Sequence, residues 1–374
     1  MSDLFTPLRI RGKSFSNRIA VSPMAQYKGD DGALSNWHSQ HLGAFAVSNP
    51  GLVIVESTSV EREGWGTATC AALHTDQQEA ALGNLLNEIR SYSDTPFGIQ
   101  FGHSGRKGST FMPREGGGPM LPDQGGWEVW GPSAIAYGPG HPTPRELGSD
   151  GLERVRAAYA QAAQRVTRLP IDLVELHGAH GYLLHTFLSP LSNQRTDAYG
   201  GTLERRTAFV AEIVQSLRAI LGSDRVLGIR LNAEDYCAGG LTLTDTIRIV
   251  AILREAGLDY VCISAGAISS DARISASPGY LVPTAGRVRR ETGITTFVTG
   301  MIFDPLLAEQ AIADGHADML AIGRAFLDNP RWPWHAAQSL GASVEMLPQF
   351  DQIRAGRWRA AAALHPQLSK SLEA

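Results

Sequence analysis

The chain alternates eight times between a short apolar segment rich in β-branched residues and a longer amphipathic segment. This alternation is typical of βα units on a parallel sheet. Eight units predict an α/β protein with a (β/α)8 TIM barrel, and a doubly wound sheet is the alternative. The predicted strands are Ile19–Met24, Leu52–Ser57, Pro96–Phe101, Ile171–His177, Val226–Leu231, Asp259–Ser264, Thr295–Gly300 and Asp318–Gly323. The predicted helices between them are Asp76–Ser91, Asp150–Arg168, Leu203–Leu221 and Thr244–Ala256.

The composition suits a globular protein that acts on small molecules. The 374 residues are 43% hydrophobic, and 33 basic against 37 acidic residues give a net charge of −4 without long runs of one sign. Such a chain lacks the basic patch that binds nucleic acid. No stretch approaches the ~18 apolar residues of a membrane span, so we expect a cytoplasmic protein. Cys70, Cys237 and Cys262 have no CxxC spacing, so we expect neither disulfides nor a cysteine-ligated cluster.

One long segment, residues 111–149, interrupts the βα pattern after the third strand. It is rich in glycine and proline but contains Trp127, Trp130 and Tyr137. Loops of this length in a compact domain are commonly functional, and a loop after a strand lies at the C-terminal face of a barrel. We therefore predict a capping loop on a barrel of residues 1–340; a surface loop anchored by its tryptophans is the alternative. Residues 341–374 form a C-terminal tail, which we consider for a subunit interface.

The ends of the strands carry the candidate site residues, because catalytic groups of a TIM barrel come from there. Gln100 lies near the end of the third strand and Arg230 near the end of the fifth, while the last two strands end at Gly300 and Gly323. Arg324 follows directly. Glycine N–H groups beside a guanidinium favour a phosphate site, and a tight turn is the alternative for each glycine.

Two further glycines precede the polar strand ends. Gly98 and Gly228 lie two residues before Gln100 and Arg230, on the same face of their strands. One interpretation is that they leave space for a flat ring system at the barrel mouth. The other is that they relieve crowding between layers of the barrel core, and both fit the sequence equally well.

His177 and His180 follow the fourth strand, and Tyr182 lies two residues further on. Two imidazoles can bind a metal, hydrogen-bond an anionic or carbonyl oxygen, or serve the structure. We favour oxygen recognition and expect no metal, because no HxH or HExxH pattern supplies further ligands. Tyr182 then suits a proton donor to a carbanion-like centre. Tyr27, after the first strand, is a candidate second phenol at the same ligand, although either tyrosine could be buried for packing alone.

Three segments resemble the Old Yellow Enzyme family: Ser22–Tyr27, Gln100–Lys107 and residues 177–201. The similarity runs in order from Leu4 to about Pro333, and Tyr27 together with the sequence HSGRK is similar to the thermophilic-like branch. The resemblance implies a barrel that holds FMN noncovalently and uses NAD(P)H. It also implies hydride transfer to the β-carbon of an α,β-unsaturated carbonyl or nitro compound, with protonation at the α-carbon.

The resemblance also assigns residues to these roles. The flavin ring would be contacted by Pro23, Met24, Ala25, Gln100 and Arg230, and its phosphate by Gly300, Gly323 and Arg324. His177 and His180 would donate hydrogen bonds to the carbonyl oxygen of an activated alkene, and Tyr182 would protonate its α-carbon. Tyr27 and Lys107 would line the pocket. One position departs from the family, because Ala25 stands where the two large branches usually carry Cys or Thr. Alanine has no heteroatom with which to modulate the flavin potential.

Some expectations concern other copies of the chain and other functions. We expect a homodimer or a higher homo-oligomer and consider Arg354, Arg357 or Trp358 for contact with a neighbouring active site; surface charges on a tail are the alternative. A dienoyl-CoA reductase-like flavoenzyme is an alternative function, but such proteins add a cysteine-rich cluster segment and further nucleotide domains. A metal-dependent hydrolase that uses His177 and His180 as ligands is an alternative from a different class.

Overall fold

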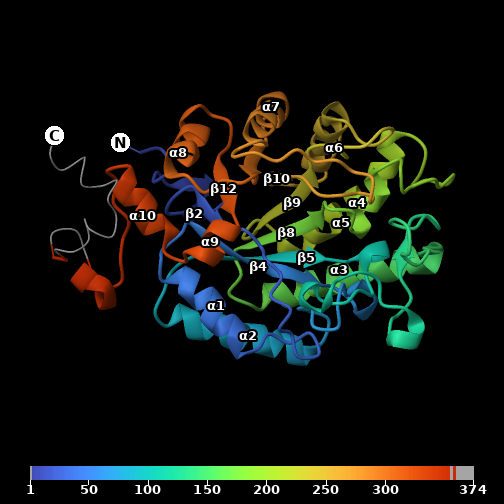
Figure 1. The fold of residues 1–374 in the computed structure, drawn as a ribbon, viewed down its shortest axis with the longest axis horizontal. Helices are drawn as coiled ribbons and strands as arrows, with labels where there is room; N and C mark the ends of the chain where they lie inside the picture. The colour runs from blue at the N-terminus through green and yellow to red at the C-terminus, as the bar shows by residue number, and fades with distance from the viewer. Residues whose placement is uncertain (1, 354–356, 359–374) are drawn as a thin grey trace.

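The computed structural model describes residues 2–353 and 357–358. Eight parallel strands close a barrel, which confirms the predicted fold (Figure 1). In their order around the barrel the strands are β3 (Ile19–Val21), β4 (Leu52–Ser59), β5 (Phe97–Gly102), β8 (Leu173–Gly178), β9 (Val226–Asn232), β10 (Tyr260–Ser264), β11 (Thr295–Val298) and β12 (Met319–Ile322). The first strand ends earlier than predicted, since Pro23 lacks the N–H that would continue the ladder.

Helices cover the outside of the barrel (Figure 1). They are α1 (Asn36–Ala46), α2 (Asp76–Arg90), α3 (Ser149–Thr167), α4 (Leu183–Leu188), α5 (Leu203–Leu221), α6 (Leu243–Glu255), α7 (Val282–Thr292), α8 (Pro305–Ala313), α9 (Arg324–Asp328) and α10 (Trp332–Ser339). The four predicted helices correspond to α2, α3, α5 and α6. Three of these begin where a threonine hydroxyl accepts a backbone N–H, at Thr75, Thr202 and Thr242. Within the described ranges no helix combines the length and apolarity needed to cross a membrane.

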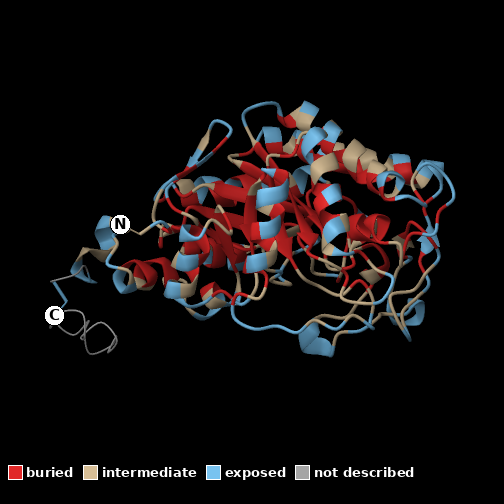
Figure 2. Cartoon of the chain, turned by 90° about the horizontal axis from the view of Figure 1, so that it is seen from above, coloured by how far each residue is buried: buried red, intermediate tan, exposed pale blue. Residues whose placement is uncertain are grey.

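The core has two parts, and the buried strands lie at its centre (Figure 2). A large cluster fills the space between the strands and the surrounding helices. A second cluster fills the barrel interior and includes Leu8, Ile10 and Phe15 from the antiparallel hairpin of β1 (Leu8–Ile10) and β2 (Lys13–Phe15). This hairpin therefore closes the N-terminal end of the barrel, and the opposite end is left for the site.

The segment 111–149 follows β5 and contains only short regular elements. These are the 3-10 turns η3 (Pro113–Glu115) and η4 (Pro122–Gln124) and the paired strands β6 (Trp130–Gly131) and β7 (Arg145–Glu146). Three other 3-10 turns are η1 (Arg62–Gly64), η2 (Gly105–Lys107) and η5 (Pro348–Ile353). The segment runs along one side of the molecule, drawn in cyan to green at the right of Figure 1.

Candidate functional site

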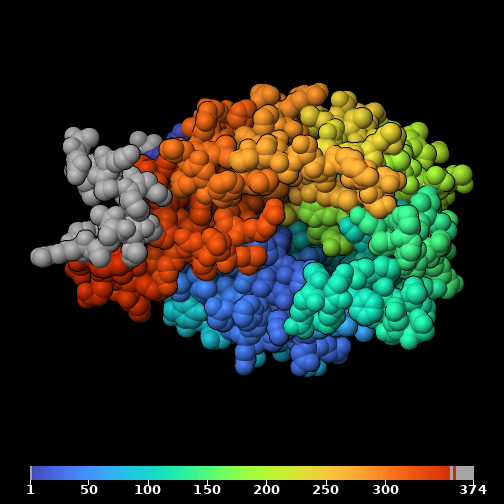
Figure 3. Space-filling model, in the orientation of Figure 1, coloured from blue at the N-terminus to red at the C-terminus, as the bar shows by residue number. Residues whose placement is uncertain are grey.

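Two cavities at the C-terminal ends of the strands contain most of the predicted site residues. The mouth cavity, of about 600 Å³, is lined by Ser22, Met24, His180, Arg230, Ser264, Thr299, Gly300, Met301, Gly323 and Arg324, among others. The cap cavity, of about 260 Å³, is lined by Ala25, Tyr27, Ser57, Cys70, Ser104, Lys107, Phe111, Pro113, His141 and Tyr182, among others. In the space-filling view a hollow opens between the blue and cyan segments and the orange segments, with green atoms at its floor (Figure 3).

Three predicted site residues line neither cavity directly. Gln100 is buried on β5 and Pro23 lies half-buried next to Met24. His177 is buried between the cavities, because its ring centroid lies 4.9 Å from that of His180 and 4.7 Å from that of Tyr182. The structure thus brings His177, His180 and Tyr182 into one aromatic cluster that borders both cavities.

Glu175 on β8 organises the floor of the mouth cavity. Its carboxylate accepts hydrogen bonds from Gln100 Nε2 at 2.7 Å, from Arg230 Nε at 3.2 Å and from Tyr260 Oη at 3.0 Å. Arg230 Nη2 also donates to Ser22 Oγ at 3.0 Å. Burial alone would lower the pKa of Arg230, but Cys262, Glu175 and Tyr260 around it raise it. The guanidinium is therefore charged, fixed in orientation and buried at the cavity wall.

The mouth cavity fits the FMN that the resemblance implies. Arg230 Nη1 donates to no described oxygen, and the backbone N–H groups of Gly300, Gly323 and Arg324 donate to no described backbone carbonyl. A Cβ added at Gly323 would meet no described atom closer than Met24 Sδ at 3.4 Å, so protein packing does not require glycine there. Unpaired donors around an open space suit an anionic ligand with a polar ring edge.

The interpretation that Gly98 and Gly228 leave space for a ring is wrong. A Cβ on Gly228 would lie 2.0 Å from the ring of Tyr260, and one on Gly98 would lie 2.8 Å from the side chain of Leu173. Tyr260 also stacks on Phe297 with ring centroids 4.2 Å apart. The two glycines therefore relieve crowding in the barrel core, and the aromatic layer that they admit forms the floor beneath the mouth cavity.

The hydrogen bonds of His177 and His180 indicate which ring atoms are available to a ligand. His177 Nδ1 accepts the backbone N–H of Ala179 at 3.4 Å, so its proton lies on Nε2, which has no partner among the described residues. His180 Nε2 lies 2.8 Å from Ser264 Oγ, and Nδ1 has no described partner. When Ser264 donates its hydroxyl proton, His180 Nδ1 also carries a free N–H.

Both imidazoles are neutral at physiological pH. Burial lowers the pKa of each histidine well below its ordinary value. The neighbouring cations Arg230 and Lys107 act in the same direction, as does His180 on His177. The pair is therefore suited to donating hydrogen bonds to an oxygen without carrying charge of its own.

Tyr182, Tyr27 and Lys107 come together at the cap cavity. Burial raises the pKa of both phenols, and Cys70 contributes to each shift, so both tyrosines keep their protons at neutral pH. The Tyr182 hydroxyl has no described partner. Lys107 Nζ donates to the backbone carbonyl of His180 at 2.7 Å and lies 5.3 Å from the Tyr182 ring centroid.

Three of the eight described non-glycine residues with a positive φ line the two cavities. Tyr27, His180 and Met301 have φ values of 54°, 61° and 54°, in the left-handed region that side chains rarely adopt. Asn232 Oδ1 accepts the His180 N–H at 3.2 Å and supports this conformation. Such strain persists only where surrounding contacts fix it, and it is concentrated at functional sites.

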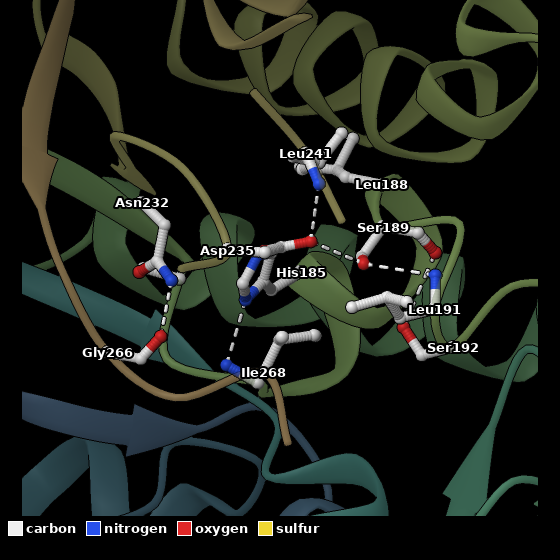
Figure 4. A network of polar contacts seen from close by, with 12 residues as sticks. His185, Leu188, Ser189, Leu191, Ser192, Asn232, Asp235, Leu241, Gly266 and Ile268 are labelled. Atoms are coloured by element: carbon white, nitrogen blue, oxygen red, sulfur yellow. Dashed lines mark hydrogen bonds and ion pairs between the residues drawn. The ribbon is translucent and has the colours of Figure 1, made fainter. Parts of the chain in front are cut away.

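Three other buried histidines share one arrangement, and we call them the clip histidines. His38, His103 and His185 each accept a backbone N–H at Nδ1, over distances of 2.9, 3.0 and 2.9 Å. Each Nε2 then carries the proton and faces a carboxylate: Glu56 at 3.1 Å, Glu61 at 2.9 Å and Asp235 at 2.8 Å. Figure 4 shows Asp235 between His185, Ser189 and the backbone N–H of Leu241. The clips fasten loops that follow β3, β5 and β8.

Sequence reasoning missed Glu175, Ser264 and the partners of the clip histidines. A signal existed for two acids, because Glu56 and Glu175 each follow a run of apolar residues within the strands β4 and β8. A charged residue in a buried strand is rare unless it is paired. No comparable pattern marks Ser264 or Asp235.

The described residues of the tail line neither cavity. Arg357 and Trp358 are exposed, Arg357 pairs with Asp351, and Arg354 lies outside the described residues. A contact with a neighbouring active site therefore stays a prediction. The hydrolase alternative finds no support, because the described residues contain no group of three metal-ligating side chains.

Comparisons with known proteins agree with this geometry. The sequence pattern of the NADH:flavin oxidoreductase / NADH oxidase family matches residues 3–342. An NADPH dehydrogenase of Geobacillus thermodenitrificans is 37% identical over 93% of this chain and 98% of its own length, and that of Bacillus subtilis is 34% identical over the same shares. Morphinone reductase matches with a TM-score of 0.76 and 26% identity over 92% of this chain and 91% of its own. A 2-naphthoyl-CoA reductase matches with a TM-score of 0.81 and 25% identity, but the chain spans only 52% of that protein.

Proposed function

This chain belongs to the NADH:flavin oxidoreductase / NADH oxidase family, the Old Yellow Enzyme family, and from this membership we propose that it is an ene-reductase. The family makes it an NAD(P)H-dependent FMN oxidoreductase. The proposed substrates are alkenes activated by a carbonyl or nitro group. The observation that carries this proposal is the cluster of two neutral imidazoles and a protonated phenol beside the mouth cavity.

The proposed cofactor contacts follow from the donors around the mouth cavity. FMN bound there would supply hydride transfer from NAD(P)H to the β-carbon of the alkene. We assign the polar edge of its ring to Gln100 and Arg230, which Glu175 holds in place. We assign the phosphate to Gly300, Gly323 and Arg324, which line the mouth cavity. From the family resemblance we assign Pro23, Met24 and Ala25 to the ring; Met24 lines the mouth cavity and Ala25 the cap cavity.

His177 and His180 would bind the oxygen of the activating group. Negative charge develops on that oxygen as the β-carbon accepts hydride, and fixed N–H donors in a buried site stabilise such charge. The neutral state of both rings supports this role, because each keeps one N–H to donate and adds no net charge. Both donors are already oriented, so little reorganisation accompanies the reaction.

Tyr182 would complete the reaction by protonating the α-carbon. Its raised pKa keeps the proton on the hydroxyl until a basic carbon lies next to it. Tyr27, in the segment after β3, lines the same cavity. We further propose that residues 111–149 cap this site and exclude water, since Phe111, Pro113 and His141 line the cavity.

The proposal is tested by the two half-reactions of purified holoenzyme. We expect NADPH or NADH to bleach the flavin absorbance anaerobically and cyclohex-2-enone to restore it. Tyr182→Phe should slow the second step about 10²- to 10⁴-fold and leave the first nearly unchanged. Equal slowing of both steps would remove the phenol from proton transfer, and bleaching that no enone or nitroalkene reverses would defeat the proposed substrate class.

A further inference from the structure

Two adjacent cations beside the cap cavity, the buried Arg106 and the half-buried Lys107, lack an acidic partner among the described residues. Arg106 is only 2% exposed and donates to the backbone carbonyls of Ile135, Ala136 and Ile268 at 2.6–3.2 Å. Lys107 donates to a carbonyl as well. Among the described ion pairs, none includes either cation. Arg230 differs, because it pairs with Glu175.

Burying an uncompensated positive charge is costly, and proteins normally supply a counter-charge. The nearest acid that acts on Arg106 is Asp235, whose carboxylate is already held by His185, Ser189 and Leu241. Burial, followed by the charge of Arg106, lowers the pKa of Lys107 to about 8. The charge that would balance Lys107 is therefore absent from the described chain.

Lys107 is the cation of this pair that a ligand can reach. It lines the cap cavity, and its Nζ lies 4.6 Å from the ring centroid of Tyr137 and 5.3 Å from that of Tyr182. Of its three N–H donors, one has an acceptor within the described part of the chain. The other two are available to a ligand that occupies the cavity.

The rest of the cap cavity suits a small anion. No Asp or Glu lines it, and hydroxyl groups line it at Ser57, Ser104, Thr67 and Thr110. The hydroxyls of Ser57 and Ser104 have no partner among the described residues, so they are free to donate. The volume of about 260 Å³ exceeds the roughly 150 Å³ of an engineered cavity that binds benzene. A six-membered ring with one small substituent therefore fits.

We propose that the substrate is an α,β-unsaturated carbonyl compound that also carries a carboxylate, and that Lys107 pairs with this carboxylate in the cap cavity, assisted by the hydroxyls of Ser57 and Ser104. This inference rests on the proposed function, which it makes more specific. The activating carbonyl group lies at His177 and His180, and the carboxylate lies at the opposite end of the ligand. The pairing supplies the missing counter-charge and selects anionic over neutral enones.

The test measures binding to oxidised holoenzyme, so it needs no turnover. The probes are cyclohexanone and 3-oxocyclohexane-1-carboxylate, which are saturated and differ by the carboxylate; their Kd values are measured by calorimetry. In the wild type we expect the carboxylate to bind about 10- to 100-fold more tightly, the range for a hydrogen-bonded charge pair. Lys107→Met should abolish this ratio and Lys107→Arg should retain most of it. Lys28→Met, at an exposed lysine outside the cap cavity, should leave it unchanged.

Three results would overturn the inference. Equal Kd values for the two ketones in the wild type do so without any variant, so a failure of Lys107→Met to fold does not protect the proposal. A preference for the carboxylate that persists in Lys107→Met also excludes Lys107. A variant that loses affinity for NADPH or NADH but keeps the ketone ratio would assign Lys107 to the phosphates of the co-substrate. Normal enone reduction in any of these cases would leave the proposed function intact.

Discussion

Five histidines near the barrel mouth form two groups, the clip histidines and the pair His177 and His180, which differ in what their Nε2 atoms face. The clip histidines and His177 all accept a backbone N–H from their own loop at Nδ1, so all four hold their proton on Nε2. In the clips that proton is donated to Glu56, Glu61 or Asp235. In His177 it has no acceptor among the described residues.

The difference shows how one side chain serves structure or chemistry. A carboxylate on Nε2 satisfies the donor, fixes the ring and removes it from any ligand. Without the carboxylate, the same ring orientation presents an N–H to a cavity. His180 belongs with His177, since Ser264 rather than an acid lies on its Nε2. The clips therefore hold the loops, and the two pocket histidines, His177 and His180, are left free to bind an oxygen.

The largest expected effect comes from breaking a clip. Asp235→Ala removes the acceptor of His185 and Ser189, which are both buried. We expect a loss of about 3–5 kcal/mol in the free energy of unfolding, the cost of breaking a buried polar pair, measured by urea denaturation. Asp314→Ala, at an exposed aspartate, should change stability by less than about 0.5 kcal/mol. A similar small change for Asp235→Ala would show that the clip does not stabilise the fold.

Removing a pocket histidine should affect enone reduction more than the stability of the fold. His177→Ala removes a donor that no described residue uses and an acceptor whose bond to the Ala179 N–H is long, at 3.4 Å, so the loss of stability should be smaller than in Asp235→Ala. Enone reduction should slow by about 10²- to 10³-fold, the usual cost of losing one oxyanion donor. Stopped-flow kinetics of the two half-reactions would check this, with flavin reduction by NAD(P)H as the internal control. If stability falls as far as in Asp235→Ala, His177 belongs with the clips.

Acid titration should separate the two groups by pH. Burial raises the pKa of Asp235 and Glu61, but the clip histidines, together with Ser189 and Leu241 at Asp235 and Arg154 at Glu61, outweigh it and hold both values below normal. Their contribution to stability is complete above the unfolded pKa of about 4 and is lost as pH falls through the folded value. The pocket histidines also have lowered pKa values, so the stability that depends on their neutral form begins to fall below about pH 6.5.

Urea unfolding midpoints measured between pH 8 and 3 would show two ranges of stability loss, one from the pocket histidines and one, at lower pH, from the clip carboxylates. Asp235→Asn should reduce the loss in the lower range by no more than about 1.5–3 kcal/mol, the contribution of a hydrogen bond to a charged group. His177→Ala should reduce the loss in the upper range and leave the lower range unchanged. A single range of stability loss that neither substitution changes would contradict the assignment.

The smallest effect is expected at the serine that distinguishes His180. Ser264→Ala removes one neutral hydrogen bond from His180 Nε2, a contribution of about 1 kcal/mol. We expect enone reduction to slow about fivefold as the ring loses its preferred proton position. Ser264→Ala should leave flavin reduction unchanged, and an unchanged enone rate as well would mean that Ser264 does not orient the ring.

The barrel could be predicted from sequence because each βα unit carries its own local pattern. The helix at Leu203–Leu221 has the predicted bounds, since its apolar spacing and its threonine cap are adjacent in the chain. Strand ends were less predictable, as Pro23 shows by ending β3 early. Packing inside the barrel was not predictable: only the folded chain shows that Tyr260 fills the space above Gly228.

The candidate site also has a part that the sequence predicts and a part that it does not. His177, His180 and Tyr182 lie within six residues of each other, so the sequence alone brings them together. The clip pairs are separated by 18, 42 and 50 residues, and each depends on two distant segments meeting at the barrel mouth. Long-range pairs of this kind leave no periodic signal.

The β1–β2 hairpin determines from which end the mouth cavity can be reached. Leu8, Ile10 and Phe15 pack into the barrel interior and block its N-terminal end. Gly300, Gly323 and Arg324 line the mouth cavity beyond the opposite ends of the strands. Whatever binds in this cavity therefore enters and leaves at the C-terminal rim of the barrel.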